Sequence, residues 1–266
     1  MSRLAALLFP IALLGCSDPF TRCDELDRNS CDRPAVGATQ TVRAIRARMP
    51  RLPESTPSDL RSVVVTAYDT YDEDGTGRVG NLFFQEISPT EAGATDPWLP
   101  CPLVRERNVR VCALSVFSPQ LAPSGFRPVA GDMVDVTGGA YTEFTCAPCG
   151  REFDNGRFIP QVSNPTITSS GVAPTPLAIP VSMADLVAHN QELIGNLVTV
   201  TDVSVSSDPD RFNEVNVGNN VKLSFQMFPS AGIGRGTRFR RVTGIAYYFY
   251  GVKLIPRTVA DLERAE

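Results

Sequence analysis

Histidine is nearly absent from this chain of 266 residues, in which His189 is the single example. Ser/His and Cys/His nucleophilic catalysis and histidine-based metal chemistry all need imidazoles. The sequence therefore disfavours most hydrolase mechanisms. Lysine is also scarce, because Lys222 and Lys253 are the only lysines among 25 basic residues. A GC-rich genome explains this use of arginine, and we attach no functional meaning to it.

The chain also lacks an excess of positive charge and a long apolar stretch. Its net charge of -4 argues against a protein devoted to non-specific nucleic-acid binding, which needs a surface that neutralises phosphates. The apolar run from Leu4 to Leu14 is shorter than the roughly 20 helical residues that span a bilayer. With 42% hydrophobic and 20% charged residues, the composition is that of a globular protein.

The N-terminus has the layout of an export signal. Arg3 precedes the apolar run, and the small residue Gly15 follows it. The ending Leu13-Leu14-Gly15-Cys16 resembles the lipobox of bacterial lipoproteins, which implies cleavage before Cys16 and attachment of lipid to its thiol. An ordinary secretory signal with an incidental cysteine and a buried core strand are the alternatives. Ser17, rather than aspartate, resembles the rule for sorting lipoproteins to the outer membrane.

Six further cysteines are expected to form disulfides, because an even number of cysteines in an exported chain indicates oxidation. Six cysteines allow 15 pairings, but these fall into three pairs that are close in sequence. The simplest prediction is therefore local pairing, with each bridge fixing a loop: Cys23 with Cys31, Cys101 with Cys112, and Cys146 with Cys149.

Residues 16–57 are predicted to be a lipid-anchored tether that follows a signal peptide at residues 1–15. Pro50, Pro53 and Pro57 disfavour a regular helix or a central strand, so the segment is expected to be extended and exposed. A nearby row of arginines is interpreted as a solvated charge run, with contact to anionic lipid as the alternative: Arg43, Arg46, Arg48 and Arg51.

From residue 58 the sequence predicts an all-β architecture of two halves, 58–172 and 173–266, joined by a short proline-containing linker. Each half contains five strand-like segments rich in β-branched residues, and the fourth contains glycines where a small barrel bends. The strands are expected at 60–69, 81–87, 111–117, 131–144 and 157–168, and at 193–205, 215–217, 221–226, 237–250 and 251–256. Ser182 and Asp185 predict a helix with a capping box over 182–190, and a second helix is expected over 258–266.

Several phrases carry a resemblance to a family: Val64-Val-Thr-Ala-Tyr68, Gly131-Asp-Met-Val-Asp-Val-Thr-Gly138 and Leu193-Ile-Gly-Asn-Leu-Val-Thr-Val200 among them. They resemble tandem OB-fold domains of bacterial exported proteins, over about residues 58–266. The resemblance implies two five-stranded OB-like barrels. Similar domains accompany secreted nucleases, but the nuclease part with its histidine and acidic metal ligands is absent here, so that activity is not implied.

An acidic loop is the best chemical candidate. Asp69, Asp72 and Asp74 alternate oxygen ligands before Gly75, as calcium loops do. However, Thr70 stands at the first position of the calcium-loop pattern and Asn81 at the twelfth. A solvated hairpin tip is therefore the favoured interpretation. We expect no cofactor, and calcium is the alternative.

Cys146-Ala-Pro-Cys149 has the spacing of a redox dithiol, but no apolar helix follows it to lower a thiol pKa. A static disulfide is favoured, and a four-cysteine zinc site that adds Cys101 and Cys112 is a more distant alternative.

A basic and aromatic surface is also considered, formed by Arg238, Arg240, Arg241 and Tyr248. Such surfaces bind single-stranded nucleic acid in OB folds, but strand alternation favours aromatic residues in the core and solvated arginines outside. His189, near the end of a short helix, is expected to be exposed and without a catalytic or metal role.

The sequence as a whole indicates a non-enzymatic, lipid-anchored protein of the outer membrane or periplasm. We expect it to bind a protein or carbohydrate partner as a binding or scaffold module. An accessory nucleic-acid-binding or nuclease-associated protein is the alternative from a different class, and a calcium-dependent module is the third.

Overall fold

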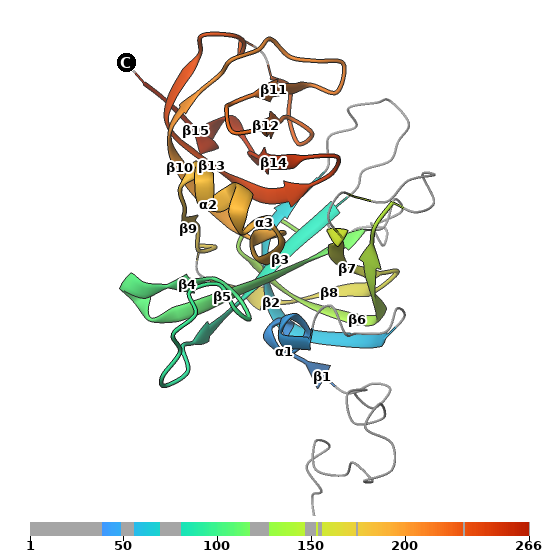
Figure 1. Ribbon diagram of the computed structural model, residues 1–266. Coiled ribbons are helices and arrows are strands. Elements are labelled where there is room, and N and C mark those ends of the chain that lie inside the picture. The colour runs from blue at the N-terminus through green and yellow to red at the C-terminus, as the bar shows by residue number, and fades with distance from the viewer. Residues whose placement is uncertain are drawn as a thin grey trace, which may run out of the picture. The chain divides into compact units, whose positions relative to one another are not determined.

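The computed structural model describes residues 39–48, 56–69, 81–117, 128–146, 153, 156–173, 175–230 and 232–265. The predicted signal peptide, the lipid-modified Cys16 and the pair Cys23 and Cys31 lie outside these residues. The described chain belongs to one unit, Val36–Glu266, which contains two sheets (Figure 1).

The first sheet contains a closed five-stranded barrel. Its strands follow the order β2-β3-β5-β7-β6, and pairing of β6 with β2 closes the ring. β5 and β7 run parallel, and the other neighbours in the ring are antiparallel. The barrel strands are β2 (Thr56–Tyr68), β3 (Asn81–Pro89), β5 (Val109–Phe117), β6 (Asp132–Phe144) and β7 (Ile159–Ser163).

Shorter elements extend this barrel. β1 runs parallel to β2 at one edge, β8 pairs with β6 at the other, and β4 pairs with β5. α1 packs against β3 and β5 with Val42 and Ile45 buried. Their bounds are β1 (Thr39–Gln40), α1 (Val42–Arg48), β4 (Leu103–Val104), the 3-10 turn η1 (Arg105–Arg107) and β8 (Thr166–Val172).

The second sheet repeats part of this order as β11-β12-β14-β13-β10-β9, with β12 parallel to β14 and β15 paired to β13. Among the described strands β10 and β11 are not neighbours, so no second closed barrel is present in this part of the chain. The bounds are β9 (Ile179–Pro180), α2 (Met183–Ala188), α3 (Asn190–Leu193), β10 (Leu197–Ser204), β11 (Glu214–Asn216), β12 (Val221–Ser224), β13 (Arg238–Tyr248), β14 (Val252–Ile255), η4 (Val259–Asp261) and β15 (Leu262–Arg264).

Two glycines permit the close packing of the fourth and fifth strands in the two sheets. A Cβ atom on Gly139 in β6 would lie 2.4 Å from Val162 Cγ1, and one on Gly244 in β13 would lie 2.7 Å from the carbonyl oxygen of Ile255. Neither distance is compatible with a methyl group, so both sites need glycine. The glycines that were expected to mark a bend in these strands therefore allow the neighbouring strand to approach closely.

Hydrophobic residues of the two predicted halves pack together. One cluster fills the barrel and includes Leu60, Leu114 and Val134. A second cluster joins Phe83 of β3 to residues of the second sheet, such as Tyr247, whose ring meets that of Phe83 edge to face at 5.7 Å. Burial of apolar surface is the main source of stability in such a core, so the two sheets stabilise each other.

Three sequence predictions need correction. The expected extended tether is wrong for Thr39–Arg48, where β1 and α1 form and Arg46 is 5% exposed. The expected C-terminal helix over 258–266 is wrong, because η4 and β15 occupy this segment and β15 pairs with β13. The strand expected over 157–168 is two strands, β7 and β8. The predicted capping box at Ser182 and Asp185 is confirmed, with both of its reciprocal hydrogen bonds formed.

Candidate functional site

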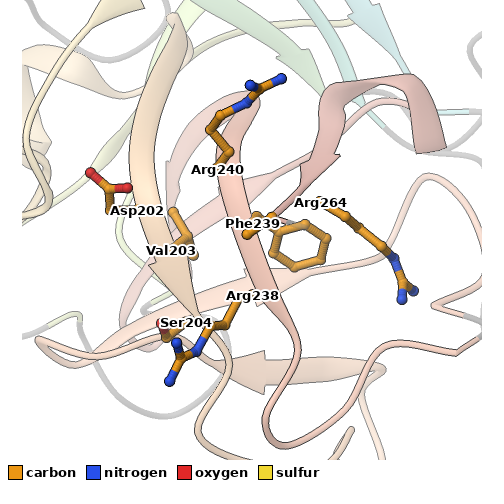
Figure 2. A pocket seen from close by; sticks show the side chains of 8 residues that line it. Asp202, Val203, Ser204, Arg238, Phe239, Arg240 and Arg264 are labelled. Atoms are coloured by element: carbon orange, nitrogen blue, oxygen red, sulfur yellow. The ribbon is translucent and has the colours of Figure 1, made fainter.

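A cleft of about 520 Å³ lies where β10, β13 and the C-terminal segment meet (Figure 2). Its lining is rich in arginine and contains a single carboxylate. The lining residues are Asp202, Val203, Ser204, Arg238, Phe239, Arg240, Arg264 and Ala265.

Strand alternation exposes two of these arginines. Arg238 and Arg240 are two residues apart, which places them on one face of β13, and both are exposed. Phe239 between them is 1% exposed and belongs to the core. Because β10 pairs with β13 in the register Ser204 with Arg238 and Val203 with Phe239, the core residues fix the strand from which the arginines project.

Charge compensation in the cleft is incomplete. Glu263 of β15 forms ion pairs with Arg240 and with Arg241, the latter at 2.9 Å. Arg264 donates a hydrogen bond from Nη2 to the carbonyl oxygen of Gly232 at 3.0 Å, and neither it nor Arg238 has an ion pair among the described residues. The cleft therefore has a local excess of positive charge in an acidic protein.

The guanidinium groups do not converge on one point. In Figure 2 the side chains of Arg238, Arg240 and Arg264 leave the sheet in three different directions. A single phosphate is best held by groups that converge, as in bidentate recognition. The spread in this cleft fits a long ligand with several separated anionic groups.

Tyr248 does not belong to this cleft. It lies near the other end of β13, where it pairs with Val252 and is 4% exposed. Its ring contacts Phe153 at a centroid distance of 5.3 Å, and the Arg157 guanidinium carbon lies 4.8 Å from the ring centroid. The structure therefore brings Arg238 and Arg240 to one cleft, places Arg241 beside it through Glu263, and separates Tyr248 from them.

The predicted calcium loop is described only at its first residue. Asp69 is 5% exposed and its backbone N–H donates to the carbonyl oxygen of Asn81 at 2.9 Å, so this residue closes the strand pair β2 and β3 rather than standing in solvent. Asp72 and Asp74 lie outside the described residues. Within the described part of the chain, no group of three or more His, Cys, Asp or Glu side chains is arranged to hold a metal ion.

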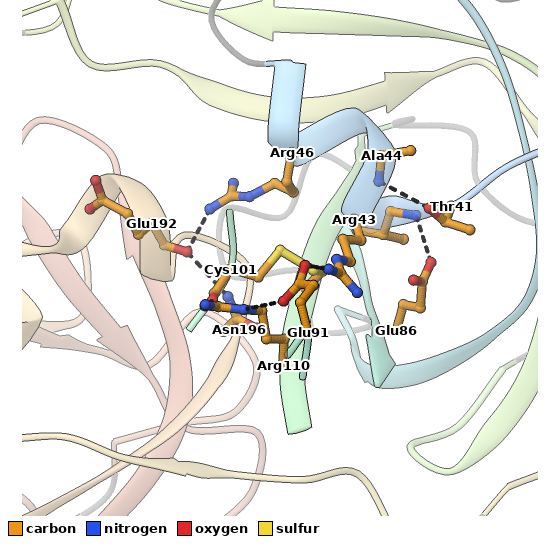
Figure 3. The surroundings of a disulfide bond; sticks show 12 residues. Thr41, Arg43, Ala44, Arg46, Glu86, Glu91, Cys101, Arg110, Glu192 and Asn196 are labelled. Carbon is orange, nitrogen blue, oxygen red and sulfur yellow. Dashed lines mark hydrogen bonds and ion pairs between the residues drawn. A yellow bond between two sulfur atoms is a disulfide. The ribbon is translucent and has the colours of Figure 1, made fainter. Parts of the chain in front are cut away.

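One of the predicted disulfides is confirmed. Cys101 and Cys112 are joined, with a Cα–Cα distance of 5.1 Å, and both are fully buried (Figure 3). Cys146 is also disulfide-bonded, and its Sγ lies 3.0 Å from the hydroxyl of Tyr250. Its predicted partner, Cys149, lies outside the described residues.

Arg110 holds the loop that precedes the Cys101–Cys112 bridge. Its side chain is 2% exposed and donates to the carbonyl oxygens of Cys101 at 2.6 Å and Asp96 at 2.8 Å, and to the Glu91 carboxylate at 3.2 Å (Figure 3). Burial lowers the pKa of Arg110, and the nearby charge of Asp96 opposes this effect. The buried Arg110 side chain and the disulfide therefore fix this loop in place.

His189 also has a partner on this loop. Its ring stacks on that of Trp98, with centroids 4.1 Å apart and planes inclined by 11°. The expectation of an exposed histidine is wrong, because the residue is half-buried against the only tryptophan of the chain. Trp98 and His189 are far apart in the sequence, so no local sequence pattern predicts their contact.

An ion cluster around the buried Glu214 in the second sheet was also not predicted. Glu214, which is 4% exposed, contacts the ammonium groups of both lysines of the chain: Lys253 at one carboxylate oxygen and Lys222 at the other, at 2.8 Å. Lys222 also binds Asp210 at 3.0 Å. The hydrogen bond that the Lys222 ammonium donates to the Glu214 carboxylate is the main cause of the raised pKa of Lys222.

No family model and no curated protein matches this chain. None of the helices in the described part of the chain has the length and apolar character needed to cross a membrane.

Proposed function

We propose that this protein is a non-enzymatic, lipid-anchored binding protein of the bacterial cell envelope with two OB-type domains. The arginine cleft is its ligand site, and an acidic carbohydrate polymer is its ligand. This choice of ligand class rests on one observation: β13 and its neighbours carry a local excess of positive charge, from exposed guanidinium groups that point in different directions.

The strand order supports the OB assignment. The barrel of the first sheet has the order first-second-third-fifth-fourth with a parallel third and fifth strand, counted along the chain. In the second sheet, β10 counts as the first strand, and the order β11-β12-β14-β13-β10 is second-third-fifth-fourth-first. This is the same circular order without the pairing of the first and second strands, and the third and fifth strands are again parallel. Five-stranded partly open barrels of this kind bind oligosaccharides and oligonucleotides.

The lipid anchor rests on the N-terminal sequence alone. Mass spectrometry of the mature N-terminus tests it: the proposal requires a chain that begins at Cys16 and carries lipid. An unmodified Cys16, or cleavage at another residue, would contradict it.

The identity of the groups around the cleft favours carbohydrate over nucleic acid. Proteins that bind single strands combine basic residues with exposed aromatic rings on which bases stack. Here the aromatic residues of β13 are buried: Phe239 is 1%, Tyr247 8% and Tyr248 4% exposed. Burial raises the pKa of Tyr247, as expected for a ring without access to solvent. The cleft therefore offers exposed cations without an exposed aromatic ring among its lining residues, which suits a ligand recognised through its carboxylates.

Binding of fluorescent oligogalacturonate, a linear polymer with one carboxylate per sugar, tests the ligand class. We expect the variant R238Q/R240Q to lose about tenfold or more in affinity, equivalent to roughly 1.4 kcal/mol. We also expect the wild-type affinity to fall as salt is added, because exposed charges are screened.

The matched control is R105Q/R107Q, which removes the same charge from two exposed arginines of η1, outside the cleft. Equal losses in the two double variants would show that only net charge matters and would reject the cleft as the site.

A further inference from the structure

Strand β8 has one edge with which no described strand pairs. Among the described strands it pairs only with β6, in the register Thr166 with Thr137 through Val172 with Asp132. Its seven residues contain no charge and no proline, and most of its side chains are exposed. Edge strands are normally protected from further pairing by lysines, prolines or bulges. The outer edge of β8 has no charge or proline, and its one irregularity is a register shift between Met133 and Val134 of β6 that leaves Ser170 as an extra residue.

An apolar groove begins where β8 ends. Its volume is about 910 Å³, and it is lined by residues of β2, of the segment before β6, of β8 and of the second sheet's loops. Three of its lining residues are strongly exposed: Val129 at 62%, Val172 at 84% and Val259 at 73%. Large exposed apolar side chains gathered in one place indicate an interaction site.

The charges around the groove restrict what it can accept. Arg257 is neutralised by Asp261, to which its guanidinium donates two hydrogen bonds at 2.7 and 2.9 Å, and the guanidinium also donates to the carbonyl oxygen of Thr66 at 3.2 Å. Asp132 accepts a hydrogen bond from the backbone N–H of Val129 at 2.8 Å but has no cation partner among the described residues. The groove therefore carries one uncompensated negative charge, beside the end of β8.

We infer that β8 and this groove form a docking site for an extended segment of a partner protein. The segment adds to the outer edge of β8 through main-chain hydrogen bonds, which is a common way in which sheets bind peptides. Its alternate apolar side chains enter the groove beside Val172 and Val259, and one basic residue faces Asp132. The site is separate from the arginine cleft, so it stands or falls independently of the ligand proposed there.

The probe is a fluorescein-labelled peptide of alternating valine and threonine with a lysine at each end, so that either strand direction places a cation near Asp132. Fluorescence anisotropy should show saturable binding to the wild-type protein. A twin peptide with glutamates at the ends should bind more weakly, and a twin with a central proline should not bind, because proline removes an N–H donor and disfavours strand pairing.

Two variants locate the site. V172N and V259N each place a neutral polar side chain in the groove, and each should weaken binding by about tenfold or more. Both valines are exposed, so a folded protein is expected, and the second variant keeps the test valid if the first does not fold. F212N is the control, because Phe212 is also an exposed apolar residue, at 59%, but lies outside the groove. It should bind the probe as the wild type does.

The inference is overturned if the lysine-ended peptide does not bind up to its solubility limit, if V172N and V259N bind it as well as F212N does, or if the proline twin binds equally. A wild-type dimer that V172N converts to a monomer would also overturn it, since the occupant would then be a second copy of this chain. Slower hydrogen exchange in residues 166–172 when the peptide is bound would support it directly.

Discussion

Loss of the Glu214 carboxylate should strongly destabilise the second sheet. Glu214 is the anion shared by Lys222 and Lys253, and the side chains of Glu214 and Lys253 are 4% and 10% exposed. The variant E214Q leaves the Lys253 ammonium buried without an opposite charge. Removing one partner of a buried ion pair costs about 3–5 kcal/mol, a large share of the total stability of roughly 5–15 kcal/mol for a typical domain.

The exposures of the two lysines differ, and this difference sets the expected magnitudes. Lys222 is 33% exposed and retains Asp210 as a partner in E214Q, so it should add little to the loss. Lys253 also lies over the Phe249 ring at 5.4 Å, and this weak attraction compensates only part of its desolvation. We therefore expect a loss near the lower end of the range, about 3 kcal/mol.

Urea denaturation of the wild type, E214Q and the double variant E214M/K253M provides the measurement. Replacing both buried charges by apolar side chains of similar length is often neutral or stabilising, so the double variant should recover most of the stability lost in E214Q. A loss below about 1 kcal/mol in E214Q, the range of exposed ion pairs, would refute the reasoning. A double variant less stable than E214Q would refute it as well.

Three further predictions follow from other contacts. G244A should destabilise the protein by about 1–3 kcal/mol and so lower its melting temperature, because the new methyl group would meet the carbonyl oxygen of Ile255. An unchanged melting temperature would contradict the steric role of Gly244. The pKa of Asp135 is lowered, mainly by a backbone hydrogen bond from Ser62, so its contribution to stability is present above the ordinary pKa and is lost as pH falls through the lowered one. D135N should therefore flatten the acid side of a plot of melting temperature against pH, and an unchanged slope would argue against the contact. H189A should move the emission maximum of Trp98 to longer wavelength, because loss of the imidazole stacked at 4.1 Å exposes the indole ring to water; an unchanged emission maximum would contradict the stack.

Many elements of both sheets were predictable, because they follow local sequence patterns. The β-branched run of β2 and the alternation of β10 each give the right element, and the capping box gives the start of α2. The alternation also predicts that Arg238 and Arg240 are exposed around the buried Phe239.

The errors arise where distant contacts override local signals. The arginine row of α1 resembles a solvated charge run, but Arg46 donates to the carbonyl oxygens of Gln191 at 3.0 Å and Glu192 at 2.5 Å. Burial lowers the pKa of Arg46 to about 10. These partners lie in α3, in the other half of the sequence, and no pattern near Arg46 announces them.

The length of β13 explains why Tyr248 was wrongly grouped with the arginines. Eight residues separate Tyr248 from Arg240, and at about 3.3 Å per strand residue this corresponds to roughly 26 Å. Tyr248 and Arg240 are therefore close in sequence but far apart in the structure. The C-terminal segment was misassigned because its composition is typical of a helix. In the structure it pairs instead with β13, with Phe239 opposite Arg264.

The most direct test of the central claim compares two polyanions at the arginine cleft. Oligogalacturonate and oligothymidylate of equal charge are titrated into the wild-type protein and into R238Q/R240Q at one salt concentration. The account predicts that the wild type binds the acidic sugar more tightly than the oligonucleotide, and that the variant loses this preference. Tighter binding of oligothymidylate, lost in the variant, would contradict the account and identify the cleft as a nucleic-acid site.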